Sequence, residues 1–313
     1  MALEKVDLIG SVICLSEELM KNPQYVTHNE SRIAIVAGNL RKKIKEQKEF
    51  WMGYPKCINI EGKRAKEKDY MLLSYELMAG AVNYQYWYGS SIIRPNGSGA
   101  TKMYEMLDES FKLAGSIYSV GHRTVCEDAC KNFMNMIVDQ RLPNSEKRIH
   151  HVQEILDSMK DGPNVISILI NAIHGKDIGV EQFLGVIIST YPGYAGDMFL
   201  KRPFLLAMML YRRIQWFKKD IHILPIPSDY QIPKMLIWLG CIQYSEELSN
   251  MISNNILIPS GSLMEAEIRA ASILVCKLLS LASGLSMCDV DTYLWLNRNK
   301  CTDQFHLTVT TDY

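Results

Sequence analysis

The spacing of apolar residues is the feature that most constrains the fold of this 313-residue chain, because it repeats every three to four positions in segment after segment. The clearest example runs from Glu265 to Leu281, where Ser262 precedes Glu265 at the spacing of a capping box. Three further helices are predicted at 145–159, 165–173 and 204–217. We therefore expect an all-α fold.

Local signals suggest where these three helices begin and end. Ser145 is a candidate cap for the first of them. The third is expected to open after Pro203 and to end at the basic pair Lys218-Lys219. The second, at 165–173, is apolar on nearly all sides, so a short buried strand is an alternative to a buried helix there.

The organisation of the chain is predicted to be one compact unit with two parts. Residues 1–140 form an N-terminal helical subdomain in this interpretation, and residues 141–313 form a second helical subdomain. The Gly- and Pro-containing clusters between segments are too short to serve as flexible linkers. The closing stretch from Phe305 to Tyr313 is β-branched and alternating, which predicts a minor extended tail packed on the helices.

The charge balance limits the class of partner. Lys plus Arg and Asp plus Glu both count 34, so the formal net charge is zero. Proteins that coat long stretches of duplex DNA usually carry a basic excess, so neutrality favours a nucleotide-sized substrate or a local basic patch. The sequence shows neither a signal-peptide pattern nor an apolar run of membrane-spanning length. A cytoplasmic protein without a membrane partner is expected.

The eight cysteines show no compact disulfide framework, which favours reduced thiols. His122, Cys126 and Cys130 are four residues apart and would share one helical face, giving three soft metal ligands. A second cysteine pair that would complete a tetrahedral site is missing from the neighbouring sequence. Buried cysteines beside a surface histidine are therefore expected, with no metal and no cofactor.

Asp229 is the leading candidate for a catalytic carboxylate. It stands between Pro227 and Pro233, and proline restricts both its own backbone and that of the residue before it. A carboxylate held rigidly in this way suits the mouth of a pocket. The alternative is that Asp229 only caps a helix that begins near Pro233, and spacing alone favours the cap.

Two further clusters contain candidate binding residues. Arg212 and Arg213 follow an apolar helical run, so at least one is expected to face inward and to need an anion, which could be Asp229, a buried Glu or a phosphate; a surface pair is equally plausible. The segment Asn83-Tyr84-Gln85-Tyr86-Trp87, with Arg94 soon after it, combines rings with amide and guanidinium groups. Such a set could sandwich a flat base and read its edge, although aromatic clusters more often belong to a core.

Residues Glu265 and Arg269 lie four positions apart on the strongest helix. The simplest prediction for them is a helix-stabilising ion pair worth roughly 0.2–0.5 kcal/mol.

From Tyr191 onward the chain resembles the queuosine-salvage proteins, which are all-helical relatives of helix-hairpin-helix DNA glycosylases that cleave the base from a 7-deazaguanine nucleoside or nucleotide. The matching segments are Tyr191–Tyr194, Tyr211–Gln215, Asp229–Pro233, Leu239–Ser245, Glu265–Arg269, Val290–Trp295 and Phe305-His306. The resemblance implies a DNA-glycosylase-like helical fold. It also adds Tyr230, Gln231, Glu267 and His306 as substrate-binding residues.

The chain departs from that family at two places. It has Pro227-Ser228-Asp229-Tyr230-Gln231 where the family reads Phe-Ala-Asp-Tyr-Arg, and a lysine of the family's site falls on Arg212. The Asn83 segment, Arg94 and Arg212 look more like a sister group of this fold, the phage α-glutamyl/putrescinyl-thymine pyrophosphorylases. Those enzymes replace a phosphate or pyrophosphate on a modified uracil base in DNA with an amine.

The leading hypothesis from this second resemblance is a thymine-hypermodification transferase that acts on a modified base in DNA with an amine or amino acid as co-substrate. Tyr84, Tyr86 and Trp87 would hold the base while Asn83 reads its edge. The two arginines, Arg212 and Arg213, would bind the departing phosphate. Asp229 would deprotonate the amine.

Two other functions compete with the transferase. In a queuosine-salvage N-glycosidase, Asp229 would support an oxocarbenium-like sugar and activate water. Tyr230 would then lie near the ribose and Arg212 near a 5′-phosphate. The third candidate is a module that binds a modified base without chemistry.

Overall fold

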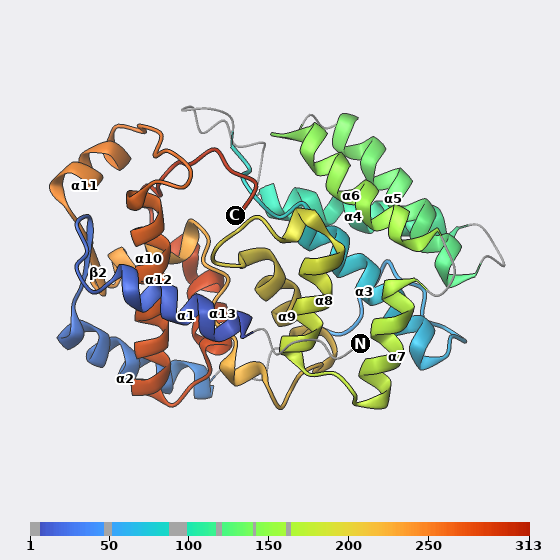
Figure 1. Ribbon diagram of the computed structural model, residues 1–313, viewed down its shortest axis with the longest axis horizontal. Coiled ribbons are helices and arrows are strands. Elements are labelled where there is room, and N and C mark those ends of the chain that lie inside the picture. Colours follow the sequence, from blue (N-terminus) through green and yellow to red (C-terminus); the bar gives the residue numbers. More distant parts are fainter. Residues whose placement is uncertain (1–6, 47–51, 88–98, 117–120, 140–141, 161–163) are drawn as a thin grey trace.

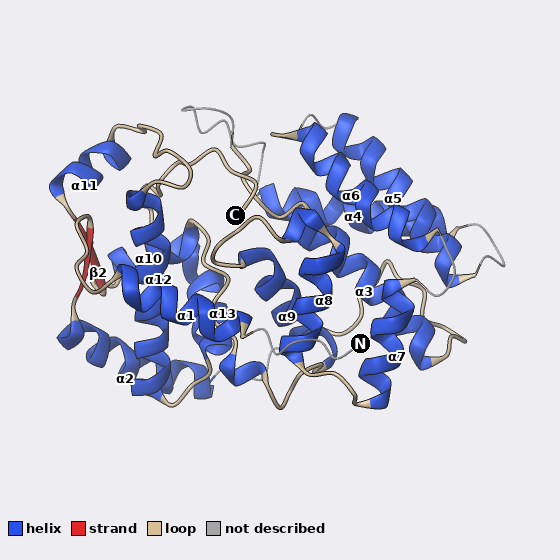
Figure 2. Ribbon diagram, in the orientation of Figure 1, coloured by secondary structure: helices blue, strands red, loops and turns tan. Residues whose placement is uncertain are grey.

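The computed structural model describes residues 7–46, 52–87, 99–116, 121–139, 142–160 and 164–313. Regular structure in these ranges is almost entirely helical, which confirms the all-α prediction (Figure 2). The α-helices are α1 (Leu8–Leu19), α2 (Glu30–Glu46), α3 (Ala65–Ala81), α4 (Gly99–Gly115), α5 (His122–Asp139), α6 (Ser145–Met159), α7 (Val165–Gly175), α8 (Val180–Thr190), α9 (Lys201–Ile214), α10 (Gln231–Trp238), α11 (Glu246–Ser253), α12 (Leu263–Ser283) and α13 (Met287–Asn297). A short antiparallel pair joins β1 (Val26–His28) to β2 (Ile242–Tyr244).

Local signals explain most helix boundaries. Helix α12 starts where the Ser262 hydroxyl accepts a hydrogen bond from the Glu265 N–H, and it ends at Gly284, whose φ of 71° suits glycine. Helix α6 has the predicted range, but its cap is Asn144, and Ser145 is its first helical residue. Segment 165–173 is part of a helix, α7, so the strand alternative is wrong.

Helix α9 begins two residues before Pro203, so the predicted start after that proline is wrong. Proline is tolerated in the first helical turn because the N–H groups there have no partner within the helix. The carboxylate of Asp197 accepts a hydrogen bond from the Lys201 N–H at 2.8 Å and so binds one of these free groups. The helix also ends earlier than predicted, at Ile214, because Gln215 adopts a left-handed conformation with φ of 62°.

The buried apolar side chains form two large clusters. The first is formed by the five helices α3, α4, α5, α6 and α7, together with the inner faces of α8 and α9. The second joins α1 and α2 to the C-terminal helices α10 to α13. In Figure 1, α3–α7 lie on one side of the molecule, α1, α2 and α10–α13 lie on the other, and α8 and α9 lie between them. The predicted boundary between residues 140 and 141 falls inside the range of the first cluster, and that division of the chain stays a prediction.

The N-terminal segment is attached to the C-terminal half by hydrogen bonds from its backbone to a side chain. The Glu267 carboxylate on α12 accepts the N–H groups of Gln24, Tyr25 and Val26 at 2.9, 2.7 and 3.1 Å. Helices α1 and α2 also pack against α12. The first and last parts of the chain therefore share one core.

The C-terminal stretch packs on the helical body as predicted. The described residues after Lys300 form no helix or strand, yet Phe305, Leu307 and Tyr313 are buried. The Leu307 carbonyl accepts a hydrogen bond from the Ile258 N–H at 2.8 Å, and the Tyr313 carbonyl accepts one from the Gln85 N–H at 2.9 Å.

All eight cysteines are free thiols, and only Cys14 is exposed. In the described ranges, no single helix has the length and apolar character needed to cross a membrane. One bent pair, α12 together with residues 287–300, meets these criteria by length and composition only.

Candidate active site

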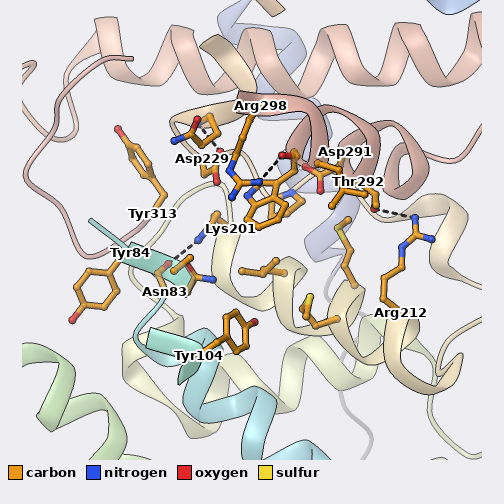
Figure 3. A pocket seen from close by; sticks show the side chains of 18 of the residues that line it. Asn83, Tyr84, Tyr104, Lys201, Arg212, Asp229, Asp291, Thr292, Arg298 and Tyr313 are labelled. Atoms are coloured by element: carbon orange, nitrogen blue, oxygen red, sulfur yellow. Dashed lines mark hydrogen bonds between the residues drawn. The ribbon is translucent and has the colours of Figure 1, made fainter. Parts of the chain in front are cut away.

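A cavity of about 460 Å³ lies where the two core clusters meet. Its wall comes from α3, the segment after it, and α4 on one side, and from α9, the start of α10, and α13 on the other; Tyr313 contributes from the C-terminal stretch. Figure 3 shows side chains from these distant elements pointing into one space. A cavity of this size, mostly apolar with a few convergent polar groups, is typical of a small-molecule site.

Asp229 caps a helix and lines the cavity at the same time. Its Oδ1 atom accepts hydrogen bonds from the N–H groups of Gln231 at 2.7 Å and Ile232 at 3.2 Å, at the start of α10. Burial raises the pKa of the Asp229 carboxyl, while the charge of Lys201 and these two N–H groups oppose that rise. The cap fixes the orientation of the carboxylate, so the two roles weighed from the sequence are compatible.

Lys201 is the cation that accompanies Asp229. The side chain is buried, with 3% of the residue exposed, and its Nζ donates to the Asn83 carbonyl at 2.7 Å (Figure 3). Burial lowers the pKa of Lys201 to about 8, and the negative charge of Asp229 acts against this fall. The cation with the largest effect on Asp229 is therefore Lys201 rather than Arg212.

Asp291, on α13, brings a second carboxyl to the same end of the cavity. It is buried, and its pKa is raised well above the usual range, first by burial and then by the charge of Asp229. Two neighbouring carboxyls with different surroundings titrate as a coupled pair, one favouring the charged form and the other the protonated form. The positive charge of Lys201 and the hydrogen bonds from two N–H groups make Asp229 the charged member.

Arg298 lies close to this carboxyl pair (Figure 3). Its guanidinium covers the face of the Trp295 ring at 3.6 Å, and Nη1 donates to the Trp295 carbonyl at 2.8 Å. Within the described ranges no carboxylate oxygen comes within 4.0 Å of the nitrogens of Arg298 or of Lys201 Nζ, whereas Arg212 and Arg213 both have one. Arg298 and Lys201 therefore supply positive charge at this end of the cavity without a close ion pair.

Arg212 and Arg213 both line the cavity, but each is already bound to a carboxylate. Arg212 Nη2 donates to Asp289 at 3.0 Å and to the Thr292 hydroxyl at 2.9 Å. Arg213 Nε donates to Glu76 at 2.8 Å. The partner of Arg213 is thus a buried glutamate, one of the predicted alternatives, and the partner of Arg212 is Asp289; neither arginine is paired with Asp229.

The aromatic element is only partly directed into the cavity. Asn83, Tyr84 and Tyr86 line it, whereas Trp87 packs against Tyr230 and Phe305 in a small apolar cluster beside it. The backbone of this element is held by the fully buried Arg148, which lies over the Tyr84 ring at 4.2 Å and donates to the carbonyls of Val82, Tyr84 and Gln85.

The remaining predicted site residues divide into three groups. Tyr230 and Gln231 line the cavity. Glu267 binds the N-terminal segment instead, and His306 is buried beside the Tyr313 hydroxyl at 3.1 Å, where burial lowers its pKa to about 3. Arg94 lies outside the described residues.

The sequence interpretation missed Lys201, Asp291 and Arg298. A helix start after Pro203 leaves Lys201 outside the helix, although a lysine at the beginning of so apolar a run is itself a signal. Asp291 stood inside the matched segment Val290–Trp295 but was not assigned a role.

A buried ion pair lies behind the site. Arg269 donates to both oxygens of Asp197 at 2.7 Å, and both side chains are 2% exposed. Asp197 accepts the Lys201 N–H, while Arg269 Nε donates to the carbonyl of Ser228, the neighbour of Asp229, at 3.4 Å. This chain of contacts links the backbones of Lys201 and Asp229. The local Glu265–Arg269 pair that the spacing predicted is replaced by this long-range one.

The possible metal ligands on α5 form no site. Cys126 and Cys130 are buried, and His122 packs edge-on against the Tyr70 ring. In the part of the chain that the structure describes, no group of three His, Cys, Asp or Glu side chains is placed to hold a metal ion.

The structure is that of an all-helical protein whose small-molecule cavity holds two carboxyl groups and a buried lysine, as in an enzyme site. The comparisons with known proteins then identify the family. The family model described as Queuosine salvage protein matches residues 62–311, so the chain belongs to the queuosine salvage protein family.

Two relatives illustrate the extent of the likeness. A Dictyostelium discoideum protein named queuosine 5′-phosphate N-glycosylase/hydrolase is 25% identical over 307 residues, which cover 87% of this chain and 88% of that protein. A Bos taurus protein of the same name is 21% identical over 254 residues, covering 71% of this chain and 72% of that protein. Both names are those of enzymes.

The leading hypothesis from the sequence, a thymine-hypermodification transferase, is wrong. The family model and the relatives agree with the N-glycosidase alternative, and they support neither a base embedded in DNA nor an amine co-substrate. The error began at Arg212, whose charge suggested an anionic leaving group opposite Asp229. Arg212 is instead paired with Asp289, and the cation beside Asp229 is Lys201.

Proposed function

We propose that this protein is an N-glycosidase that hydrolyses queuosine 5′-phosphate and releases its 7-deazaguanine base. The observation that carries the proposal is the group formed by Asp229, Lys201 and Asp291 in one cavity. Family membership and the names of the relatives support the same activity.

The three side chains divide the chemistry between them. The glycosidic C–N bond breaks through an oxocarbenium-like state, which the ionised Asp229 stabilises. Asp229 then takes a proton from water as the water oxygen bonds to the sugar carbon. Asp291, the protonated member of the pair, gives its proton to the departing base. Lys201 keeps Asp229 charged. One water is consumed, and no cofactor enters these steps.

The 5′-phosphate is assigned to the positive charge of Arg298 together with Lys201. Arginine binds phosphate through paired N–H groups, and Arg298 is the cavity guanidinium without a carboxylate partner among the described residues. This replaces Arg212 as the expected phosphate contact.

The direct test compares two substrates. The protein is incubated with queuosine 5′-phosphate and, separately, with the queuosine nucleoside, and free base is measured by mass spectrometry. Release from the phosphate at a kcat/KM on the order of tenfold to hundredfold above that of the nucleoside is expected, since a charged hydrogen bond contributes about 1.5–3 kcal/mol. The variant Arg298→Met should remove this preference. An intact nucleotide after prolonged incubation would exclude the proposed reaction.

The pH dependence tests the division of roles between the carboxyls. Activity should fall at low pH as Asp229 becomes protonated and at high pH as Asp291 loses its proton, which gives a bell-shaped kcat/KM profile. In Asp291→Asn, kcat should drop on the order of 10²–10⁴-fold because the amide has no proton to give. An unchanged rate and an unchanged alkaline limb in this variant would remove Asp291 from the reaction.

A further inference from the structure

The end of the cavity across from Asp229 has its own polar groups. Tyr104 lies there in Figure 3, and its ring stacks on that of Tyr75 with the centroids 6.3 Å apart. The Tyr75 hydroxyl donates to Oδ1 of Asp108 at 2.7 Å, and Asp108 lines the cavity from α4. Two aromatic rings and a carboxylate therefore meet at this end.

Besides Tyr75, Asp108 has a second hydrogen-bond donor, Cys57. The Cys57 thiol contacts the same Oδ1 atom at 3.2 Å. Burial and the nearby Asp108 raise the pKa of Cys57 to about 12, so the thiol stays protonated and adds no charge. In the described residues, no hydrogen bond is made to the other oxygen, Oδ2, and no Lys or Arg nitrogen lies within 4.0 Å of the carboxylate. One oxygen of Asp108 is therefore free to meet a ligand.

The charge at this end of the cavity is negative. Glu76 and Arg213 are paired at 2.8 Å and cancel each other, which leaves the charge of Asp108. The charge of Asp108 also helps to raise the pKa of Glu76, after burial, so the two carboxyls lie within electrostatic reach. A phosphate would be repelled here and attracted to the opposite end, at Arg298 and Lys201. With the sugar at Asp229, the base must extend toward Asp108.

We propose that Asp108, with the rings of Tyr75 and Tyr104, forms a specificity subsite for a positively charged amino substituent on the base of the substrate. A carboxylate beside aromatic rings recognises an ammonium group through an ion pair and cation–π attraction. The subsite rests on the proposed N-glycosidase function, because that function sets the direction of the base in the cavity.

The test uses two nucleotides that differ at one group. The first is 7-aminomethyl-7-deazaguanosine 5′-monophosphate, whose amine is protonated at neutral pH, and the second is the neutral 7-cyano analogue. Base release is measured by mass spectrometry, and binding by calorimetry. The wild-type protein should favour the amine in both assays on the order of tenfold to hundredfold. In Asp108→Asn that ratio should fall to near one, whereas the control Asp157→Asn, an exposed position on α6, should keep it.

The outcomes separate the subsite from the reaction. The subsite is overturned if the wild-type protein binds and cleaves the two nucleotides equally well. It is also overturned if Asp108→Asn keeps the preference of the wild type, even when both nucleotides are cleaved. Tighter binding of the amine without cleavage of either nucleotide supports the subsite, and the assay with queuosine 5′-phosphate then decides the proposed function separately. If Asp108→Asn does not fold, as judged by its melting curve, the wild-type comparison together with Tyr75→Phe decides the question, since that change removes a donor to Asp108 and should lower the preference.

Discussion

Replacing Asp229 with asparagine should lower kcat for base release on the order of 10²–10⁴-fold with little change in the melting temperature. The amide oxygen can still accept the Gln231 and Ile232 N–H groups, so the cap of α10 is kept. The charge that stabilises the sugar cation and deprotonates water is lost. Single-turnover release of free base from queuosine 5′-phosphate, followed by mass spectrometry, measures the effect.

The matched control is Asp128→Asn on α5, away from the cavity, which should behave like the wild type. Full activity in Asp229→Asn would return Asp229 to the role of helix cap alone. Unchanged ligand affinity with no turnover in either the variant or the wild type would instead favour the base-binding module considered from the sequence.

Replacing Arg269 with methionine should lower the free energy of unfolding by about 3–5 kcal/mol, more than any other single substitution proposed for this protein. The change leaves the Asp197 carboxylate buried without its partner and removes the contact to the Ser228 carbonyl. Urea denaturation followed by circular dichroism measures the loss. A loss below about 1 kcal/mol would mean that the pair is not needed to hold this part of the fold.

A double variant separates stability from positioning. Adding Asp197→Asn to Arg269→Met removes the unpaired charge but keeps an oxygen for the Lys201 N–H, so part of the stability should return. Both Arg269→Met and the double variant should have a low kcat, because the link from Lys201 to the backbone next to Asp229 is broken in each. Recovery of both quantities together would show that the pair acts on stability alone.

The sequence predicted the fold best where short-range signals agreed. The range of α12 was close to the prediction because the serine cap and the regular apolar spacing mark the same helix. The start of α9 was wrong because the first helical turn accepts proline, so Pro203 does not mark the boundary; Asp197, four positions before Lys201, was the overlooked local signal. The Arg269 partner was also missed: Asp197 is 72 positions away, and local spacing carries no information about such a contact.

The site was predictable only in part for a similar reason. Asp229 stood out because prolines flank it and the family resemblance contains it. Lys201, Asp291 and Arg298 reach it from α9, α13 and the end of α13, and only the packing of these elements brings them together. The predicted transferase chemistry was wrong because the sequence does not show that Asp289 neutralises Arg212.

The contact between Glu267 and the N-terminal segment has a consequence for how the chain is made. The Val26 N–H and its acceptor are 241 positions apart, so a ribosome working at roughly 5–20 residues per second adds the acceptor about 12–48 s later. During that interval the apolar faces of α1 and α2 have no α12 to cover them. The apolar faces of α1 and α2 are therefore exposed in the nascent chain, where chaperones can bind them, until α12 has been translated and the second core can form.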